Sequence, residues 1–108
     1  MGRKGDKPTG QSISFVEELV PRLSGLGDVT ARKMFGGYGV FGDGKMFGLV
    51  TSGAEFFLKV DESNLARYEK AGSPRHGKMP YYQVPEAVLR DDAQLAQWAR
   101  LSITISQG

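Results

Sequence analysis

The chain has 108 residues, contains no cysteine and carries a formal net charge of +2. This length predicts one domain with a modest core, and the lack of cysteine excludes disulfides and thiolate metal sites. Residues 1–12 hold Arg3, Lys4 and Lys7 against Asp6, so the charges of the remaining residues balance. A neutral body of this kind disfavours DNA binding through many phosphate contacts.

The first residues are rich in glycine, lysine and other polar residues, so we expect residues 1–11 to form a disordered tail. A single domain is expected over residues 12–106. The tail lacks the apolar stretch of a signal peptide, and the apolar runs elsewhere are far shorter than a membrane span. Together with the absence of cysteine, these features favour a cytoplasmic location without membrane contact.

A first helix is predicted from Ser14, where Ser-Phe-Val-Glu forms a capping box. Apolar residues then recur at helical spacing, at Val16, Leu19, Val20 and Leu23. Pro21 should kink this helix or split it, because proline lacks a backbone donor. The glycines within residues 24–27 should end it.

Four candidate strands follow, at residues 29–35, 38–41, 45–51 and 55–60. Gly42-Asp43-Gly44 lies between two apolar runs and predicts a tight hairpin, since glycine and aspartate tolerate positive φ. The glycines at 36, 37 and 39 indicate a bend or bulge, or a close approach to the backbone. A phosphate-binding loop is disfavoured, because the element that follows them is a strand and not a helix.

The second half of the sequence predicts a helix that opens at residues 61–64, with Leu65 and Tyr68 on its apolar face. After a polar link, residues 79–84 have the pattern of a strand, with Pro80 near its start or on a sheet edge.

Two further helices are predicted near the end of the sequence. Pro85 suits the first turn of a short helix that runs to Leu89. Asp91-Asp92 should start the last helix, because acidic residues favour a helix N-terminus. We expect this helix to fray over residues 103–106, where β-branched residues replace helix formers, with Ile103 or Ile105 as an anchor.

These elements predict an α+β fold, an antiparallel sheet of about four to five strands with N-terminal, middle and C-terminal helices. Phe56 and Phe57 are adjacent in a strand and so point to opposite faces. Either helices cover both faces of the sheet, or one face keeps an exposed apolar patch. Such a patch would indicate a protein interface.

The sequence does not group residues in a way that suggests catalysis or metal binding. His76 is the single histidine, lies in a polar stretch and is expected to be solvated. The acidic pairs Glu17-Glu18 and Asp91-Asp92 lie at predicted helix starts, where the helix dipole explains them. We therefore expect a protein that is not an enzyme and that uses no cofactor and no metal.

Basic residues concentrate between positions 67 and 78, just before Tyr81 and Tyr82. The candidate nucleic-acid contacts are Arg67, Lys70, Arg75, His76 and Lys78. A solvated charged face is the simpler interpretation of this pattern. Nucleic-acid binding by charge and stacking, aided by the basic N-terminal tail, remains the alternative.

Several blocks of sequence together resemble the TfoX N-terminal domain of the TfoX/Sxy family. Arg-x-Met-Phe-Gly-Gly-Tyr-Gly-Val at 32–40 is followed by Met-Phe-Gly-Leu-Val at 46–50. The resemblance continues at 57–61, 79–85 and 95–99 and spans about residues 13–101. The matching residues are Arg32, Met34, Phe35, Gly36, Gly37, Tyr38, Gly39, Met46, Phe47, Leu58, Lys59, Val60, Asp61, Tyr81, Tyr82, Pro85, Leu95 and Trp98.

Members of this family regulate natural competence in bacteria by acting on the expression of DNA-uptake genes, and the family has no established catalytic activity. The resemblance implies a compact fold like that of secretion chaperones, in the order α-β(3)-α-β(2)-α. It also implies structural or interaction roles for the motif residues. A non-enzymatic module is therefore expected, acting through protein contacts in transcription regulation, with another protein or a second copy of the chain as its partner.

The sequence departs from the family pattern in two informative places. Longer members carry a second, helical domain after the first, so a stand-alone first domain is expected here. Family members often have a Phe-x-Tyr strand before the Tyr-Tyr block, whereas residues 73–78 are short and polar. We expect that strand to be curtailed, which would leave a less protected sheet edge.

Overall fold

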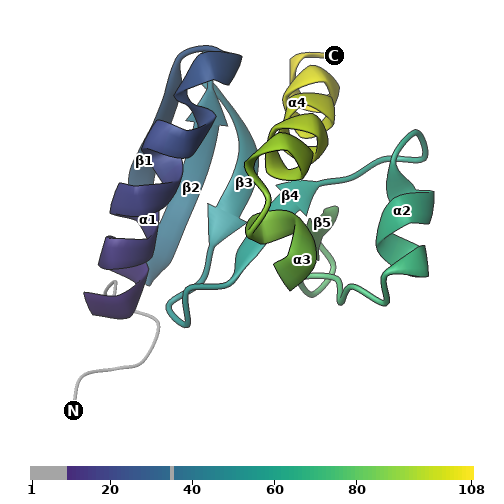
Figure 1. Cartoon of the computed structure of the whole chain (residues 1–108), viewed down its shortest axis with the longest axis horizontal. Helices are drawn as coiled ribbons and strands as arrows, with labels where there is room; N and C mark the ends of the chain where they lie inside the picture. The colour runs from purple at the N-terminus through teal and green to yellow at the C-terminus, as the bar shows by residue number, and fades with distance from the viewer. Residues whose placement is uncertain (1–9, 35) are drawn as a thin grey trace.

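The computed structural model describes residues 10–34 and 36–108. Within these residues, five antiparallel strands form one sheet in the order β1-β2-β3-β4-β5 (Figure 1). The strands are β1 (Val29–Met34), β2 (Gly37–Gly42), β3 (Lys45–Val50), β4 (Phe56–Lys59) and β5 (Tyr81–Gln83). The helices are α1 (Gly10–Leu23), α2 (Leu65–Lys70), α3 (Glu86–Leu89) and α4 (Asp92–Gln107), with a 3-10 turn, η1 (Ser24–Leu26), after α1.

The predicted α+β class, with N-terminal, middle and C-terminal helices around an antiparallel sheet, is confirmed. The resemblance implied three strands before the middle helix and two after it. In the structure, four strands precede α2 and one follows it. The fourth strand joins the first group through a tight turn at residues 51–54, in which Ala54 has a φ of 63°.

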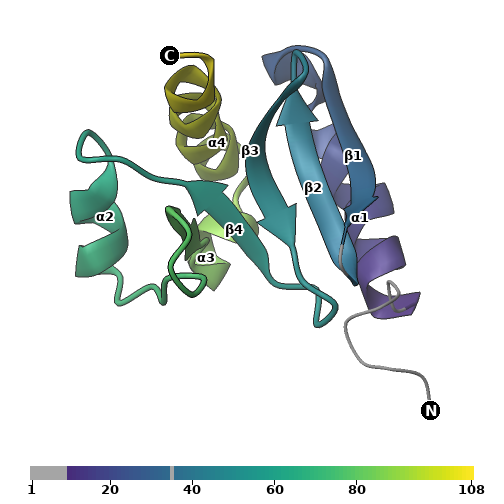
Figure 2. The same cartoon turned by 180° about the vertical axis from the view of Figure 1, so that it is seen from behind.

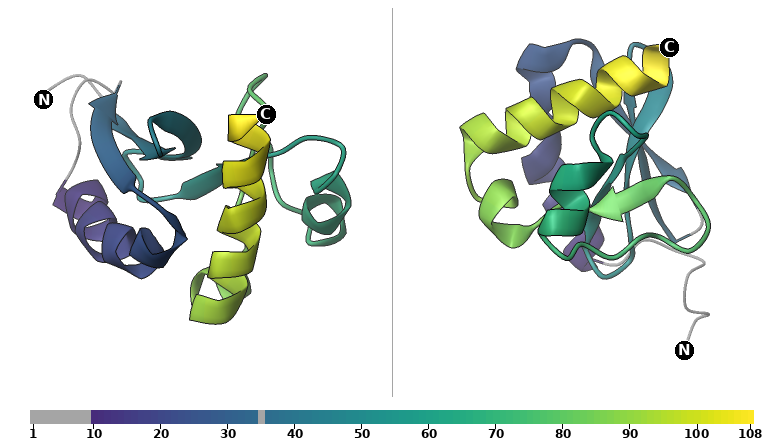
Figure 3. Two further views of the ribbon diagram at one scale, coloured as in Figure 1. Left: turned by 90° about the horizontal axis from the view of Figure 1, so that it is seen from above. Right: turned by 90° about the vertical axis from the view of Figure 1, so that its right-hand side faces the viewer.

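The long helices α1 and α4 lie on the same face of the sheet, and the opposite face turns toward the viewer in Figure 2. The view from above separates the layer of strands from these helices (Figure 3). The main core lies between the two layers. Its fully buried side chains are Leu19, Leu23, Val40, Phe47, Val50, Phe56, Leu58, Tyr68 and Leu95.

A β-bulge decides which side chains of β3 reach this core. The pairing of β2 with β3 shifts between Val40 and Phe41, which leaves Phe47 as an extra residue. Phe47 therefore packs in the helical core, whereas Met46 and Leu49 pack on the opposite face.

The hairpin predicted at Gly42-Asp43-Gly44 is confirmed. Asp43 has a φ of 51° and Gly44 a φ of 87°, and a tight primed turn needs positive φ at both positions. The close backbone approach foreseen for the glycine segment occurs at Gly37, where a Cβ would collide with the carbonyl oxygen of Val50.

The first helix ends at Leu23, before residues 24–27 as predicted, but it differs from its prediction at its start and at Pro21. It begins at Gly10, so the expected tail is wrong for residues 10 and 11, and the rest of that tail lies outside the described residues. Ser14 is exposed inside the helix and does not cap it. Pro21 does not split the helix, because it lies in the last turn and costs only the donor to the carbonyl of Glu17.

The last helix does not fray where β-branched residues predicted it. Ile103 is buried in the core, and α4 continues to Gln107. The side-chain amide of Gln107 donates a hydrogen bond to the carbonyl oxygen of Gly42 at 3.0 Å. This contact and the burial of Ile103 offset the weak helix propensity of the segment.

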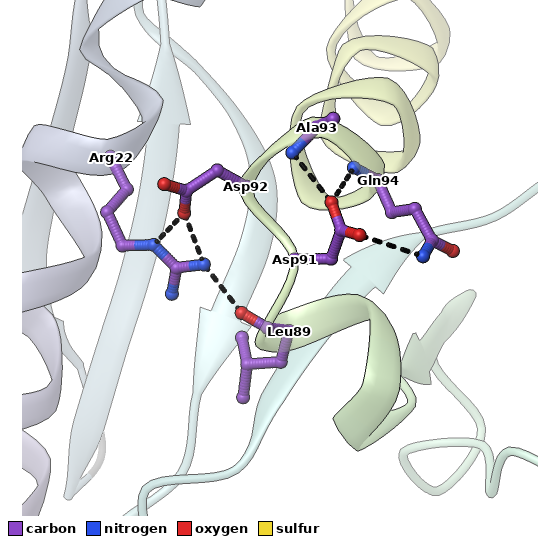
Figure 4. A network of polar contacts seen from close by, with 6 residues as sticks. All are labelled: Arg22, Leu89, Asp91, Asp92, Ala93 and Gln94. Atoms are coloured by element: carbon purple, nitrogen blue, oxygen red, sulfur yellow. Dashed lines mark hydrogen bonds and ion pairs between the residues drawn. The ribbon is translucent and has the colours of Figure 1, made fainter.

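Arg22 at the end of α1 connects this helix to the junction of α3 and α4 (Figure 4). Its Nε donates to a carboxylate oxygen of Asp92 at 2.8 Å, and its Nη2 donates to the carbonyl oxygen of Leu89 at 2.6 Å. A carbonyl that a short helix such as α3 leaves without an internal donor is thereby satisfied.

Asp91 caps the N-terminus of α4, as the sequence predicted. Its carboxylate accepts from the backbone N–H of Ala93 at 3.0 Å and of Gln94 at 3.1 Å (Figure 4). These hydrogen bonds to Gln94 and Ala93 lower the pKa of Asp91 below its ordinary value of 3.8.

Asp91→Ala should lower the melting temperature measurably at pH 7, because α4 loses its cap. The carboxylate's contribution is present above its ordinary pKa and is lost as the pH falls through the lowered folded-state pKa. Asp91→Asn should retain much of the capping but remove this acid dependence. Thermal unfolding of the three proteins between pH 2 and pH 7 checks both statements; identical pH profiles for the original protein and Asp91→Asn would contradict them.

The segment before β5 forms no full strand, as expected, but it still protects the sheet edge. Arg75 makes an isolated bridge with Tyr82. The backbone N–H of His76 donates to the carbonyl of Tyr81 at 2.8 Å, and that of Gln83 donates to Pro74 at 3.0 Å. The prediction of a less protected edge is therefore wrong, because these backbone hydrogen bonds satisfy β5 from outside.

Candidate functional site: the open face of the sheet

The face of the sheet away from α1 and α4 carries a second, smaller apolar cluster. Leu49, Phe57 and Tyr81 are buried there, and Met46 packs against them. The turn that precedes β5 covers part of this face, since the ring of His76 contacts the ring of Phe57. Within residues 10–34 and 36–108, helices therefore cover one face of the sheet, and the turn before β5 covers part of the other.

Beside this cluster the open face is hollowed into a groove with a volume of about 300 Å³. Its walls come from β1, β2, β3 and the turn before β5, and they include Met34, Gly37, Met46, Leu49, His76 and Met79. Met79 is one of two large hydrophobic residues that remain exposed among the described residues, at 41%. The groove is therefore mainly apolar and open to solvent.

Glycine on β2 leaves room for the methionine side chains of the groove. A Cβ at Gly39 would lie closer than 3.0 Å to the Sδ of Met34 and 3.1 Å from that of Met46. The two sulfur atoms consequently lie over the same backbone position, at most about 6 Å apart. Gly39 is therefore a packing position. From the sequence alone, this glycine could have marked either a bend in the strand or a close approach to the backbone.

The turn before β5 brings two more side chains to the groove. The backbone N–H of Met79 donates to the carbonyl of His76 at 3.1 Å, which places both residues on one tight turn. The His76 ring meets Phe57 edge-on at 4.9 Å and is partly buried. The expectation of a solvated histidine is therefore wrong, because this turn folds back onto the sheet.

Tyr81 anchors the floor of the second cluster. Its hydroxyl donates to the carbonyl oxygen of Met46 at 3.4 Å, and burial raises the pKa of this phenol. The hydroxyl stays protonated at neutral pH, so its role here is that of a donor to β3.

Basic side chains stand at the edge of the groove. Arg32 lies 4.8 Å above the ring of Phe41, on the same face as Met34 because the two are separated by one residue of β1. The Nε and Nη2 of Arg75 donate to the carbonyls of Met79 and Lys78, both at 2.9 Å. An apolar hollow with a positive rim results.

The structure divides the matching motif residues between two roles. The groove takes Met34, Gly37, Tyr38, Gly39 and Met46 from β1, β2 and β3. The core and the residues packed against it include Phe47, Leu58, Val60, Tyr82, Leu95 and Trp98. Pro85 precedes α3, and the carbonyl of Lys59 accepts a hydrogen bond from Ser102. Gly36 has a φ of 86° at the β1–β2 turn, and Phe35 lies outside the described residues.

The candidate nucleic-acid contacts fall into two separate groups. Arg67 and Lys70 belong to α2, where the guanidinium of Arg67 lies 5.3 Å from the ring of Trp98. Arg75, His76 and Lys78 belong to the turn beside the groove. The turn group therefore lies beside the groove, and Arg67 of the α2 group packs against Trp98 of α4.

The sequence pattern of the TfoX N-terminal domain matches residues 21–105. The chain belongs to the TfoX N-terminal domain family. This match covers all five strands of the sheet and most of α4, so the resemblance carried by the sequence blocks is confirmed. A search of curated proteins returned no match to the chain.

The convergence of Met34, Met46, Met79 and His76 is what sequence reasoning missed. Methionine recurs in three separate motif blocks, which was a usable signal. The bulge at Phe47 and the turn before β5 bring these residues together, and neither feature is evident from strand alternation. Within the part of the chain that the structure describes, no helix has the length and apolarity needed to cross a bilayer.

Proposed function

We propose that this TfoX N-terminal domain is a non-enzymatic regulatory module that works in the cytoplasm by binding another protein in transcription regulation. The observation that carries the proposal is the apolar groove on the face of the sheet that no long helix covers. Exposed apolar surface of this kind typically marks a protein interface. The family membership supports the regulatory part of the proposal, because TfoX proteins regulate competence.

The partner that fits the groove presents an apolar side chain flanked by acidic residues. Methionines line the groove, and their flexible thioether side chains adapt to different apolar shapes. Arg32, on the same face as Met34, and Arg75, which donates to the carbonyl of Met79, would attract a carboxylate and steer the encounter. A second copy of the chain and a nucleic acid are the competing occupants.

Two exposed hydrophobic residues of similar accessibility provide a matched test. Met79 is 41% exposed at the groove, and Ile13 is 38% exposed on α1. A photoreactive phenylalanine analogue at position 79 should cross-link one partner in cells, and the same analogue at position 13 should not. The cross-linked partner peptide, identified by mass spectrometry, should contain an apolar residue beside Asp or Glu.

The variant Met79→Glu should abolish capture of that partner, because it places a negative charge where an acidic segment docks. Ile13→Glu should leave capture unchanged. Cross-linking of position 79 to a peptide of this same sequence would show that a second copy of the chain, and not another protein, occupies the groove. Equal cross-linking from positions 79 and 13 would overturn the protein-docking proposal. So would a gel shift of duplex DNA at low salt that the Met79→Glu variant no longer produces.

A further inference from the structure

We propose that the groove on the open face also binds a soft monovalent metal ion, Cu(I) in particular. Its ligands are the thioether sulfurs of Met34, Met46 and Met79 and the imidazole of His76. All three methionines of the described residues and the single histidine line this one groove. The sequence had predicted no metal site, because His76 is the single histidine and the chain contains no cysteine.

The ligand chemistry selects the ion. Thioether sulfur is a soft, neutral donor that favours Cu(I), whereas carboxylate and carbonyl oxygen suit magnesium and calcium. The described residues that line the groove include no carboxylate, so a divalent cation would enter without a compensating negative charge from them. A monovalent ion has the smallest desolvation cost in such surroundings.

The geometry places the sulfurs of Met34 and Met46 close enough to converge. The sulfurs of Met34 and Met46 share the space above Gly39, at most about 6 Å apart. Methionine has three rotatable side-chain bonds, so small rotations bring both sulfurs to one ion. Met79 stands at the mouth with 41% of its surface exposed, which gives the ion an entry path.

His76 is placed to supply the fourth ligand. Its ring is held edge-on against Phe57 at 4.9 Å, which restricts its orientation. Among the described residues, its ring nitrogens take part in no hydrogen bond, so a lone pair is available when the imidazole is neutral.

Two features of the site argue against a cation, and both set limits on affinity. Methionine commonly fills apolar gaps without binding anything. Arg32 and Arg75 also add positive charge near the groove, although the guanidinium of Arg75 is directed to the carbonyls of Met79 and Lys78. Replacing methionine by leucine separates these alternatives, because leucine conserves the apolar volume and removes the sulfur.

The test is anaerobic competition for Cu(I) between the purified chain and the chromophoric chelator bicinchoninate, with no partner protein present. One Cu(I) per chain should be withdrawn from the chelator, and Zn(II) should not compete. The triple variant Met34→Leu, Met46→Leu, Met79→Leu should lose at least about a hundredfold in affinity, since even outer-shell changes cost about 10–100-fold. Methionine methyl NMR signals should shift on addition of air-stable Ag(I).

The single variants Met79→Leu and His76→Gln keep the test valid if the triple variant fails to fold, because both side chains lie on the surface turn. Each should weaken Cu(I) binding by about tenfold or more. Failure of the chain to withdraw Cu(I), or equal withdrawal by Met79→Leu and the original protein, would overturn the metal site. Neither outcome bears on partner docking, which is measured by cross-linking without added metal.

Discussion

Gly37→Ala should destabilise the protein by about 3 kcal/mol or more. A Cβ at this position would collide with the carbonyl oxygen of Val50 and lie 3.3 Å from the Cα of Thr51. Both obstacles are backbone atoms, so no side-chain rotation can relieve the clash. The end of β2 would have to move away from β3, which also forms a wall of the groove.

Gly25→Ala is the matched control for this change. No atom outside its neighbours lies within 4 Å of a Cβ at Gly25, and its φ is not positive, so the same substitution should be nearly neutral there. Urea unfolding of the three proteins, followed by the fluorescence of the single Trp98, measures the difference. Equal midpoints for Gly37→Ala and Gly25→Ala would mean that β2 and β3 do not approach as closely as described.

The importance of this glycine was only half visible in the sequence. Three glycines within four positions signalled either curvature or a close approach, and the structure assigns the close approach to Gly37. Which atom approaches depends on the partner strand, since strand pairing is a tertiary property. Local sequence rules specify turn geometry at Asp43-Gly44 but not the identity of a neighbour across the sheet.

The β2–β3 hairpin and the start of α4 were predictable because their signals are local. Asp91 satisfies backbone N–H groups two and three residues ahead, and the hairpin needs only positive φ at two adjacent positions. The ends of the helices were less predictable. The helix α4 is extended by the burial of Ile103 and by a hydrogen bond from Gln107 to a distant strand.

The candidate site was the least predictable part, because it depends on register. One extra residue at Phe47 sends Met46 and Leu49 to the open face, and strict alternation would have placed Leu49 on the side of Phe47. His76 was assigned to solvent because its neighbours are polar, yet the turn carries it onto Phe57. The sequence left two alternatives open, helices on both faces of the sheet or an exposed apolar patch on one face, and the described residues fit the second.

Tyr68 should make the protein lose stability between pH 10 and pH 12. Its side chain is fully buried, and its ring packs edge-on against Trp98 at 4.8 Å. Burial raises the pKa of Tyr68 from 10.0 to about 12, with the nearby hydroxyl of Ser102 and the charge of Arg67 opposing this rise. The hydroxyl of Ser102 donates to the carbonyl of Lys59 at 2.8 Å, and the phenolic oxygen itself has no well-formed hydrogen bond within the described residues.

The sign follows from proton binding in the two states. Below pH 10 both states hold the phenolic proton, so the full stability is present. Between pH 10 and pH 12 the unfolded chain has lost this proton and the native protein retains it, so the free energy of unfolding falls as the pH rises. A raised pKa of this size corresponds to a loss of about 2–3 kcal/mol.

Tyr68→Phe isolates this contribution, because it removes the phenol and keeps the ring that packs on Trp98. At pH 7 the variant should be at least as stable as the original protein, since a buried hydroxyl without a well-formed hydrogen bond is lost. At pH 12 it should be more stable by about 2–3 kcal/mol, because the phenylalanine does not titrate. Other groups titrate alike in both proteins and cancel in the difference. Urea unfolding at pH 8, 10 and 12 measures that difference in the free energy of unfolding. Parallel pH profiles of the two proteins would contradict the prediction. They would show that Tyr68 is hydrated in the folded protein and that α2 packs against α4 less tightly than described.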